Sequence, residues 1–240
     1  MGDYWDYPWG DGGGGQSSGG LSSLFNTGNL DKDQYEKLKK EYEKMLEECT
    51  YKAINNGLLS SGIKLGNVLE DPNLPDNAVG AVTSDGDFKV KDVYTTGVNT
   101  FKHEWIHLYQ KYLQGIEVHD SLYTGMAEFE VAAFRDIEIY KRGDEAEFNY
   151  RLQDVSLGYT SWIHNTEISE ERRNGYIDWI KNLSTGDTDL SNPTSIEIFK
   201  FWAQLFGQYG PYRHRGYEYS NINYPLTALE GLIQILTNCK

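Results

Sequence analysis

Residues 101–110 read F-K-H-E-W-I-H-L-Y-Q and contain the spacing H-E-x-x-H at His103, Glu104 and His107. On a helix of 3.6 residues per turn, side chains four positions apart lie one above the other on the same face. The two imidazoles can therefore bind one metal ion, while Glu104 can reach a water molecule on that metal. The stretch predicts a zinc site with His103 and His107 as ligands and Glu104 as the catalytic general base.

A third zinc ligand is needed, because catalytic zinc usually has three protein ligands and one open position. The longer metzincin signature places a glycine and a histidine after the motif, but these positions hold Gln110 and Leu113, so that pattern is absent. The next predicted helix offers Glu128 and Glu130, which are two residues apart and so lie on nearly opposite faces. We favour Glu128, which lies nearer the helix start, and keep Glu130 as the alternative ligand, or as a solvated side chain or a partner of Arg135.

The net charge and the hydropathy pattern exclude two classes of partner. The net charge is −14, and such a field repels the phosphate backbone of nucleic acids. No stretch approaches the roughly 20 apolar residues that cross a bilayer, so we expect no membrane span and a soluble chain. The first residues lack the basic and then apolar pattern of a signal peptide, which fits a cytosolic chain or the mature form of a secreted or cell-surface chain.

The N-terminal segment differs in composition from the rest of the chain. Residues 1–28 are rich in glycine and serine, which predicts a flexible tail, and residues 29–240 are predicted to form a single domain. The aromatic residues near its start leave a docking peptide as the alternative to an unstructured leader. Cys49 and Cys239 could form a disulfide if the fold brings their Cα atoms to about 5.5 Å, which the sequence leaves open.

The hydrophobic pattern predicts an α+β fold that is mostly helical. A capping box at Asp31 and Gln34 begins a helix that ends near residue 48, and residues 50–60 either continue it or form a second short helix that ends near Gly57. A small sheet is expected from runs at 63–65, 78–82 and 88–94, with a hairpin turn at Asp85-Gly86. The motif helix is predicted over 99–113, and Gly115 is expected to end it. The remaining helices are predicted over 126–141, 145–157, 169–183, 193–207 and 225–237, and the last two of these begin with prolines.

The H-E-W-I-H helix and the later segment A-E-F-E-V-A together resemble the gluzincin-type zinc metallopeptidases, over residues 88–142. In these families a zincin core binds zinc through two histidines and a downstream glutamate. The phrase E-F-E-x-A is similar to the third-ligand segment of a membrane-associated branch of the gluzincins, in which the first glutamate is the ligand. The resemblance therefore implies a zincin-like domain with zinc on His103, His107 and Glu128. Ala132 departs from the pattern, because an acidic residue often follows four positions after the ligand.

The resemblance also implies a function, the hydrolysis of peptide bonds in a peptide or protein substrate. Glu104 would take a proton from the zinc-activated water and pass it to the leaving amine. An extended peptide would bind at a sheet edge formed by residues 89–95. Tyr123, His214 or a tyrosine of residues 209–224 would stabilise the oxyanion.

Two other classes of function compete with a peptidase. One is a catalytically inactive binding protein on a zincin scaffold, and the other is a zinc hydrolase of a non-peptide amide. The remaining histidines, His119, His164 and His214, are predicted to be surface or structural residues. The sequence does not indicate the substrate specificity or the oligomeric state.

Overall fold

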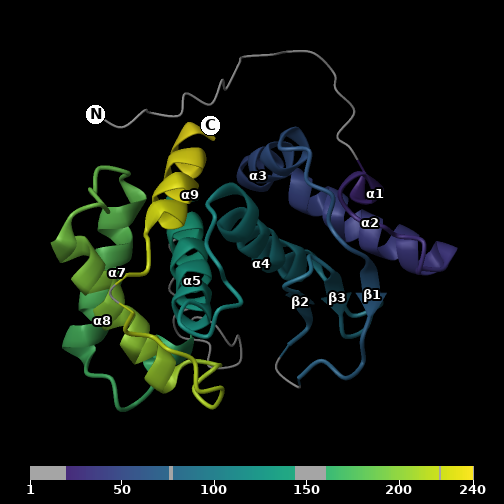
Figure 1. Cartoon of the computed structure of the whole chain (residues 1–240). Coiled ribbons are helices and arrows are strands. Elements are labelled where there is room, and N and C mark those ends of the chain that lie inside the picture. Colours follow the sequence, from purple (N-terminus) through teal and green to yellow (C-terminus); the bar gives the residue numbers. More distant parts are fainter. Residues whose placement is uncertain (1–19, 76–77, 144–160, 222, 240) are drawn as a thin grey trace.

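The computed structural model describes residues 20–75, 78–143, 161–221 and 223–239 as an α+β fold that is mostly helical. Figure 1 shows α4 and α5 in the middle, the sheet with α1, α2 and α3 on one side, and α7, α8 and α9 on the other. The helices are α1 Leu21–Leu24, α2 Lys32–Leu46, α3 Cys49–Ser60, α4 Val98–Leu108, α5 Thr124–Lys141, α7 Glu170–Ser184, α8 Pro193–Tyr209 and α9 Thr227–Asn238, with a π-helical turn at Tyr109–Leu113 and a 3-10 turn at Ser161–His164. The helix predicted over 145–157 lies outside the described residues.

The capping box predicted for α2 is confirmed. The Asp31 side chain accepts a hydrogen bond from the Gln34 amide at 2.9 Å, and the Gln34 side chain accepts one from the Asp31 amide at 3.0 Å. These bonds satisfy amides of the first turn that have no partner within the helix. The apolar face of α2 is buried, with Leu38, Tyr42 and Met45 in the core.

The predicted tail boundary at residue 28 is wrong for residues 20–28, while residues 1–19 lie outside the described part of the chain. Leu21, Leu24 and Phe25 are buried in the core, and the Leu24 carbonyl accepts a hydrogen bond from the Leu65 amide at 3.0 Å. These three apolar residues have helical spacing, and their burial outweighs the entropic cost of ordering the adjacent glycines and serines.

A three-stranded sheet precedes α4 and has the order β1-β3-β2. β3, Phe88–Val90, is the central strand, paired in parallel with β1, Val68–Glu70, and in antiparallel with β2, Gly80–Val82. The predicted hairpin between β2 and β3 is confirmed, and Gly86 adopts a φ of +83° that favours glycine. The strand predicted over 63–65 is wrong, because the first strand begins later, at Val68.

An aromatic cluster fixes the rotation of the motif helix α4. Phe101 and Trp105 are fully buried, and Trp105 lies 5.5 Å from Tyr42 and 6.1 Å from Phe88 between ring centroids. The Trp105 indole and the Tyr42 hydroxyl both donate to Asn55 Oδ1, at 3.2 and 2.9 Å. Since this aromatic side packs against α2, α3 and β3, His103 and His107 lie on another face of α4, which borders β2.

The C-terminal helices pack around α5. Two of their predicted starts are confirmed, because Ser169 caps α7 and Asn192 caps α8, with Pro193 in the first turn. Pro225 was predicted in the first turn of the last helix, but α9 begins at Thr227 after an N-cap at Leu226. None of the described helices is long and apolar enough to cross a membrane.

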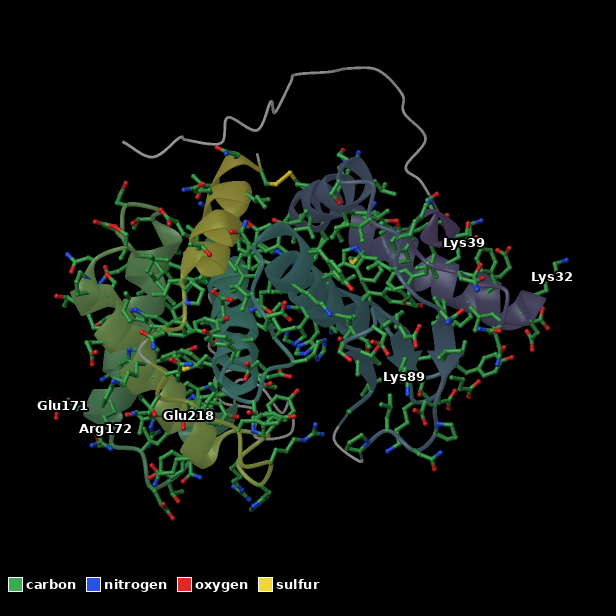
Figure 2. All side chains as sticks on the ribbon, in the orientation of Figure 1. Lys32, Lys39, Lys89, Glu171, Arg172 and Glu218 are labelled. Carbon is green, nitrogen blue, oxygen red and sulfur yellow. A yellow bond between two sulfur atoms is a disulfide. The ribbon has the colours of Figure 1, made fainter. Side chains whose placement is uncertain are left out.

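A disulfide closes the fold, a pairing that the sequence left open. Cys49 at the start of α3 and Cys239 after α9 are bonded, with their Cα atoms 5.6 Å apart. Figure 2 shows this bond in yellow beside the end of α9, and labelled charged side chains such as Lys32 and Glu171 project from the periphery. The bond joins residues 190 positions apart, so it removes much conformational freedom from the unfolded chain.

Candidate metal centre

Helices α4 and α5 run in opposite directions, and this arrangement brings their functional side chains together. His107, near the end of α4, lies beside Glu128 near the start of α5. Asn99, two turns earlier on α4, accepts a hydrogen bond at 2.9 Å from Arg135, two turns later on α5. The two helices therefore form opposite walls of one site.

His103, His107 and Glu128 form a cluster of three potential ligands. The two imidazole Nε2 atoms lie 3.1 Å apart. His103 Nε2 lies 3.5 Å from Glu128 Oε2, and His107 Nε2 lies 3.6 Å from Glu128 Oε1. Metal–ligand bonds of about 2.0–2.2 Å at tetrahedral angles separate neighbouring ligand atoms by roughly 3.4 Å. Two histidines and one glutamate are also a donor set of catalytic zinc sites, so the residues present fit a zinc ion. Of the two candidates on α5, the structure brings Glu128 to the histidines.

Gln110 orients one of the histidines. Its Oε1 lies 2.7 Å from His107 Nδ1, where it can accept the Nδ1 proton, and this leaves Nε2 to face the cluster. The Gln110 amide in turn donates to the Ala127 carbonyl at 3.2 Å and to Glu130 Oε2 at 2.5 Å. Position 110, where the metzincin pattern has a glycine, thus holds a glutamine that connects α4 with α5.

Glu130 faces away from the metal ligands, and its predicted surroundings are wrong. It is completely buried rather than solvated, and it does not pair with Arg135. Three donors surround its carboxylate: Gln110 at 2.5 Å, the Tyr224 hydroxyl at 2.8 Å and the Leu229 amide at 2.8 Å. Arg135 instead contacts Asn99 and Glu138. The difference arises because Glu130 and Arg135 project from different faces of α5.

Glu104 lies at the same site and is held by the sheet. Its Oε2 accepts a hydrogen bond from the Val82 amide at 2.8 Å, and its Oε1 lies 3.9 Å from His103 Nε2. Its side chain is only 4% exposed. One oxygen is thus anchored by β2, while the other faces the cluster.

Burial and mutual charge shift the pKa values of these groups. Burial raises the pKa of Glu104 to about 7 and lowers that of His103 to about 3. Burial also disfavours the charged form of His107, but the Glu128 carboxylate outweighs this effect and raises its pKa to about 9. The site therefore favours one positive charge beside Glu128.

A cavity of about 430 Å³ opens onto the cluster and is bounded by β2, α4, α5 and the segment after α8. Tyr212, from the predicted tyrosine-rich segment, lines the cavity and forms a hydrogen bond with Glu128 that lowers the carboxyl pKa. Tyr123 and His214 are not among the lining residues, so the structure does not bring these two oxyanion candidates to the site. His119 is exposed, as predicted, but lies on the cavity wall.

The predicted substrate-binding edge at residues 89–95 is wrong. Lys89 and Val90 belong to β3, which has a neighbour on both sides because β1 pairs with its far edge. The edge strands are β1 and β2, and β2 lines the cavity. Glycine at position 80 lets this strand approach α4, because a Cβ there would lie 2.5 Å from Thr100 Cγ2.

Two supporting residues could have been recognised from the sequence. Gln110 lies three positions after His107, which is helical contact spacing for an orienting hydrogen bond. Glu130 is surrounded by apolar residues, which signals a buried carboxylate with dedicated donors. Tyr212 and Val82 carry no comparable local signal, because they reach the site from distant parts of the chain.

Other proteins provide no independent assignment of this site. A comparison of the chain with protein-family models, curated proteins and solved structures finds no match. Three features of the geometry mark the site: three ligand atoms at metal-binding separations, a buried carboxylate beside them, and a cavity bounded by an edge strand.

Proposed function

We propose that this protein is a zinc-dependent peptidase of the gluzincin type with a zincin-like fold. The observation that carries the proposal is the cluster of His103, His107 and Glu128, with Glu104 beside it and a cavity in front. A helix with H-E-x-x-H, a third ligand on the next helix and an edge strand along the site agree with the resemblance. Glu128 is the proposed third ligand, and Glu130 is assigned a supporting role.

The proposed reaction uses Glu104 as a general base. When bound, zinc supplies a Lewis acid that polarises the scissile carbonyl and lowers the pKa of water towards about 7. Glu104 accepts a proton from the attacking water, whose oxygen bonds to the carbonyl carbon. The carbon–nitrogen bond then breaks, and Glu104 passes the proton to the leaving amine. The Val82 amide keeps one carboxylate oxygen in place during both transfers.

The backbone of β2 offers a binding edge for an extended peptide. Val79 and Thr83 bond to β3, through Lys91 N to Val79 O and Thr83 N to Asp87 O, both at 2.9 Å. Because pairing alternates along an antiparallel strand, the amide and carbonyl groups of Gly80 and Val82 point to the opposite edge. The bond from the Val82 amide to Glu104 agrees with this direction. A substrate strand can therefore pair with Gly80 beside the catalytic carboxylate.

Zinc content and turnover test the proposal. We expect about one zinc ion per chain in purified protein by elemental analysis, and loss of peptide hydrolysis on chelation, with recovery when zinc is restored. Glu104→Gln should lower the turnover of a mixed peptide library about 10²- to 10⁴-fold, the range for loss of a general base. Its zinc content should be unchanged, because Glu104 is not a proposed ligand.

Glu43→Gln on α2 is a matched control, since this exposed glutamate lies outside the cavity and its replacement should preserve both properties. Absence of stoichiometric zinc would refute the metal site. Zinc with equal turnover of wild type and Glu104→Gln would refute the peptidase and leave a zinc-binding protein.

A further inference from the structure

Arg135 is a largely buried cation on the wall of the same cavity. Its side chain is 13% exposed and lines the cavity together with Asn99 and Thr100. On α5 it follows Glu128 by seven residues, so the two side chains share a face. The axial rise of 1.5 Å per residue separates their Cα atoms by about 10 Å, and helical side chains lean towards the N-terminus, which brings the guanidinium closer to the metal ligands.

The charges around Arg135 do not balance. Its Nη2 donates to Asn99 Oδ1 at 2.9 Å, and its Nε lies 3.6 Å from Glu138. Glu138 is shared, because Arg142 contacts it at 2.9 Å. The connected cluster contains three cations and two carboxylates: Lys102, Arg135, Arg142, Glu48 and Glu138. One positive charge is therefore in excess within this cluster, and Arg135 is its only member that lines the cavity.

The guanidinium retains donor capacity. Asn99 and Tyr51 are its hydrogen-bond partners, and its buried Nε lies beside Glu138 without forming a hydrogen bond, so other N–H groups remain for a ligand. A guanidinium presents five N–H donors in a planar fork that matches a carboxylate. The start of α4 lies beside it without a side-chain cap at Gly97, and the positive end of this helix further favours an anion.

The wall between Glu128 and Arg135 leaves space for a small substrate group. It consists of Val131 and Ala132, both of which line the cavity and are buried. Ala132 ends at Cβ and carries no charge, so neither bulk nor repulsion separates the metal ligands from the guanidinium. Because one extended residue covers about 3.3–3.6 Å, roughly three substrate residues span a distance of about 10 Å.

Arg215 is the other arginine of the cavity, but its surroundings differ. It stacks over the Tyr212 ring at 5.2 Å and donates to the Tyr217 hydroxyl at 3.3 Å. The Glu128 carboxylate is among the charges that raise its pKa. Arg215 is therefore held by two tyrosines, whereas Arg135 lies on the wall beside the start of α4, so we assign the substrate contact to Arg135.

We propose that Arg135 binds a carboxylate on the substrate, within about three residues of the bond that is cut. This inference rests on the proposed peptidase function and names its substrate class. The carboxylate can come from an aspartate or glutamate side chain, or from the C-terminus of the peptide. Either source offers the two oxygens that a guanidinium binds in parallel.

The test compares three peptides for binding to zinc-loaded Glu104→Gln, so that turnover is not required. The first is an alanine hexapeptide with an acetylated and an amidated end, the second has a central glutamate, and the third has a free C-terminal carboxylate. We expect at least one carboxylate peptide to bind about 10- to 100-fold more tightly than the neutral peptide in calorimetry. Whichever of the two carboxylate peptides binds more tightly identifies the source of the carboxylate, a side chain or the C-terminus.

Variants assign the preference to one residue. Arg135→Gln in the same background should reduce the carboxylate preference to near one, and Arg135→Lys should retain part of it. Arg213→Gln is the control. The substitution removes the same charge, but Arg213 is exposed and does not line the cavity.

The inference and the peptidase can fail separately. Equal affinity for all three peptides, no measurable binding of the carboxylate forms, or a preference that survives Arg135→Gln overturns the inference. If Arg135→Gln does not fold, the three-peptide comparison and Arg135→Lys still decide it. A carboxylate preference without turnover by the wild type would refute the peptidase and retain the binding site.

Discussion

Two faces of α5 carry carboxylates in opposite surroundings. On the cavity face, Glu128 lies 3.5 and 3.6 Å from the Nε2 atoms of His103 and His107, with Tyr212 as its hydrogen-bonding partner. On the core face, Glu130 receives hydrogen bonds from Gln110, Tyr224 and the Leu229 amide. The two glutamates are two residues apart, yet one faces potential metal ligands and the other faces only donors.

The comparison shows that the neighbours of a carboxylate decide its role. A carboxylate with three donors is satisfied without a metal ion, because each donor compensates part of the lost hydration. Glu128 faces the lone pairs of two imidazoles, so a cation between them is the natural complement. Gln110 links the two faces, since it contacts both His107 and Glu130. Four substitutions test this contrast.

The largest expected effect is the loss of the metal ion in Glu128→Ala. Removal of a ligand should abolish stoichiometric zinc binding, an effect greater than the roughly 10- to 100-fold that loss of a ligand's hydrogen-bond partner causes. Competition with a chromophoric chelator measures this affinity. Glu171→Ala on α7, an exposed glutamate, is the control. Full zinc content in Glu128→Ala would mean that another residue is the third ligand.

Glu130→Ala should lower the stability of the fold more than it lowers the affinity for zinc. Three buried donors lose their acceptor, so the free energy of unfolding without zinc should fall by about 3–5 kcal/mol. Denaturant unfolding of the metal-free protein measures it, and metal-free Glu128→Ala should lose less. If Glu130→Ala instead loses zinc at unchanged stability, the roles of the two glutamates are exchanged.

Gln110→Ala should weaken zinc binding without abolishing it. His107 loses the acceptor of its Nδ1 proton, and loss of such a partner lowers metal affinity about 10- to 100-fold. The same chelator competition provides the measurement, with the exposed Gln204→Ala on α8 as the control. Unchanged affinity in Gln110→Ala would show that the ring is oriented by other contacts.

Tyr224→Phe should have the smallest effect. It removes one of the three donors to Glu130 while the ring stays packed, so we expect a loss of about 1.5 kcal/mol in unfolding free energy and little change in zinc affinity. Tyr94→Phe is the control, because Tyr94 is 60% exposed and its hydroxyl should contribute less than about 0.5 kcal/mol. Equal stability of both variants would show that two donors suffice for Glu130.

Local features of the chain could be predicted because they depend on residues a few positions apart. The capping box of α2, the β2–β3 hairpin and the starts of α7 and α8 form as expected. The short apolar triplet of α1 and the position of β1 were missed. Both are stabilised by contacts with each other and with the core, such as the Asn26–Asn67 bridge, rather than by local propensity.

For the candidate site, the sequence alone determined that His103 and His107 share one helical face with Glu104 beside them, since the helical period dictates it. Only the tertiary structure decided that Glu128 approaches these histidines while Glu130 is buried, and that β2 is the edge strand beside the cavity. It also decided that Cys49 meets Cys239, and that Tyr212 and Arg135 join the cavity. These outcomes depend on the relative placement of elements far apart in the chain, which core packing sets and local spacing does not encode.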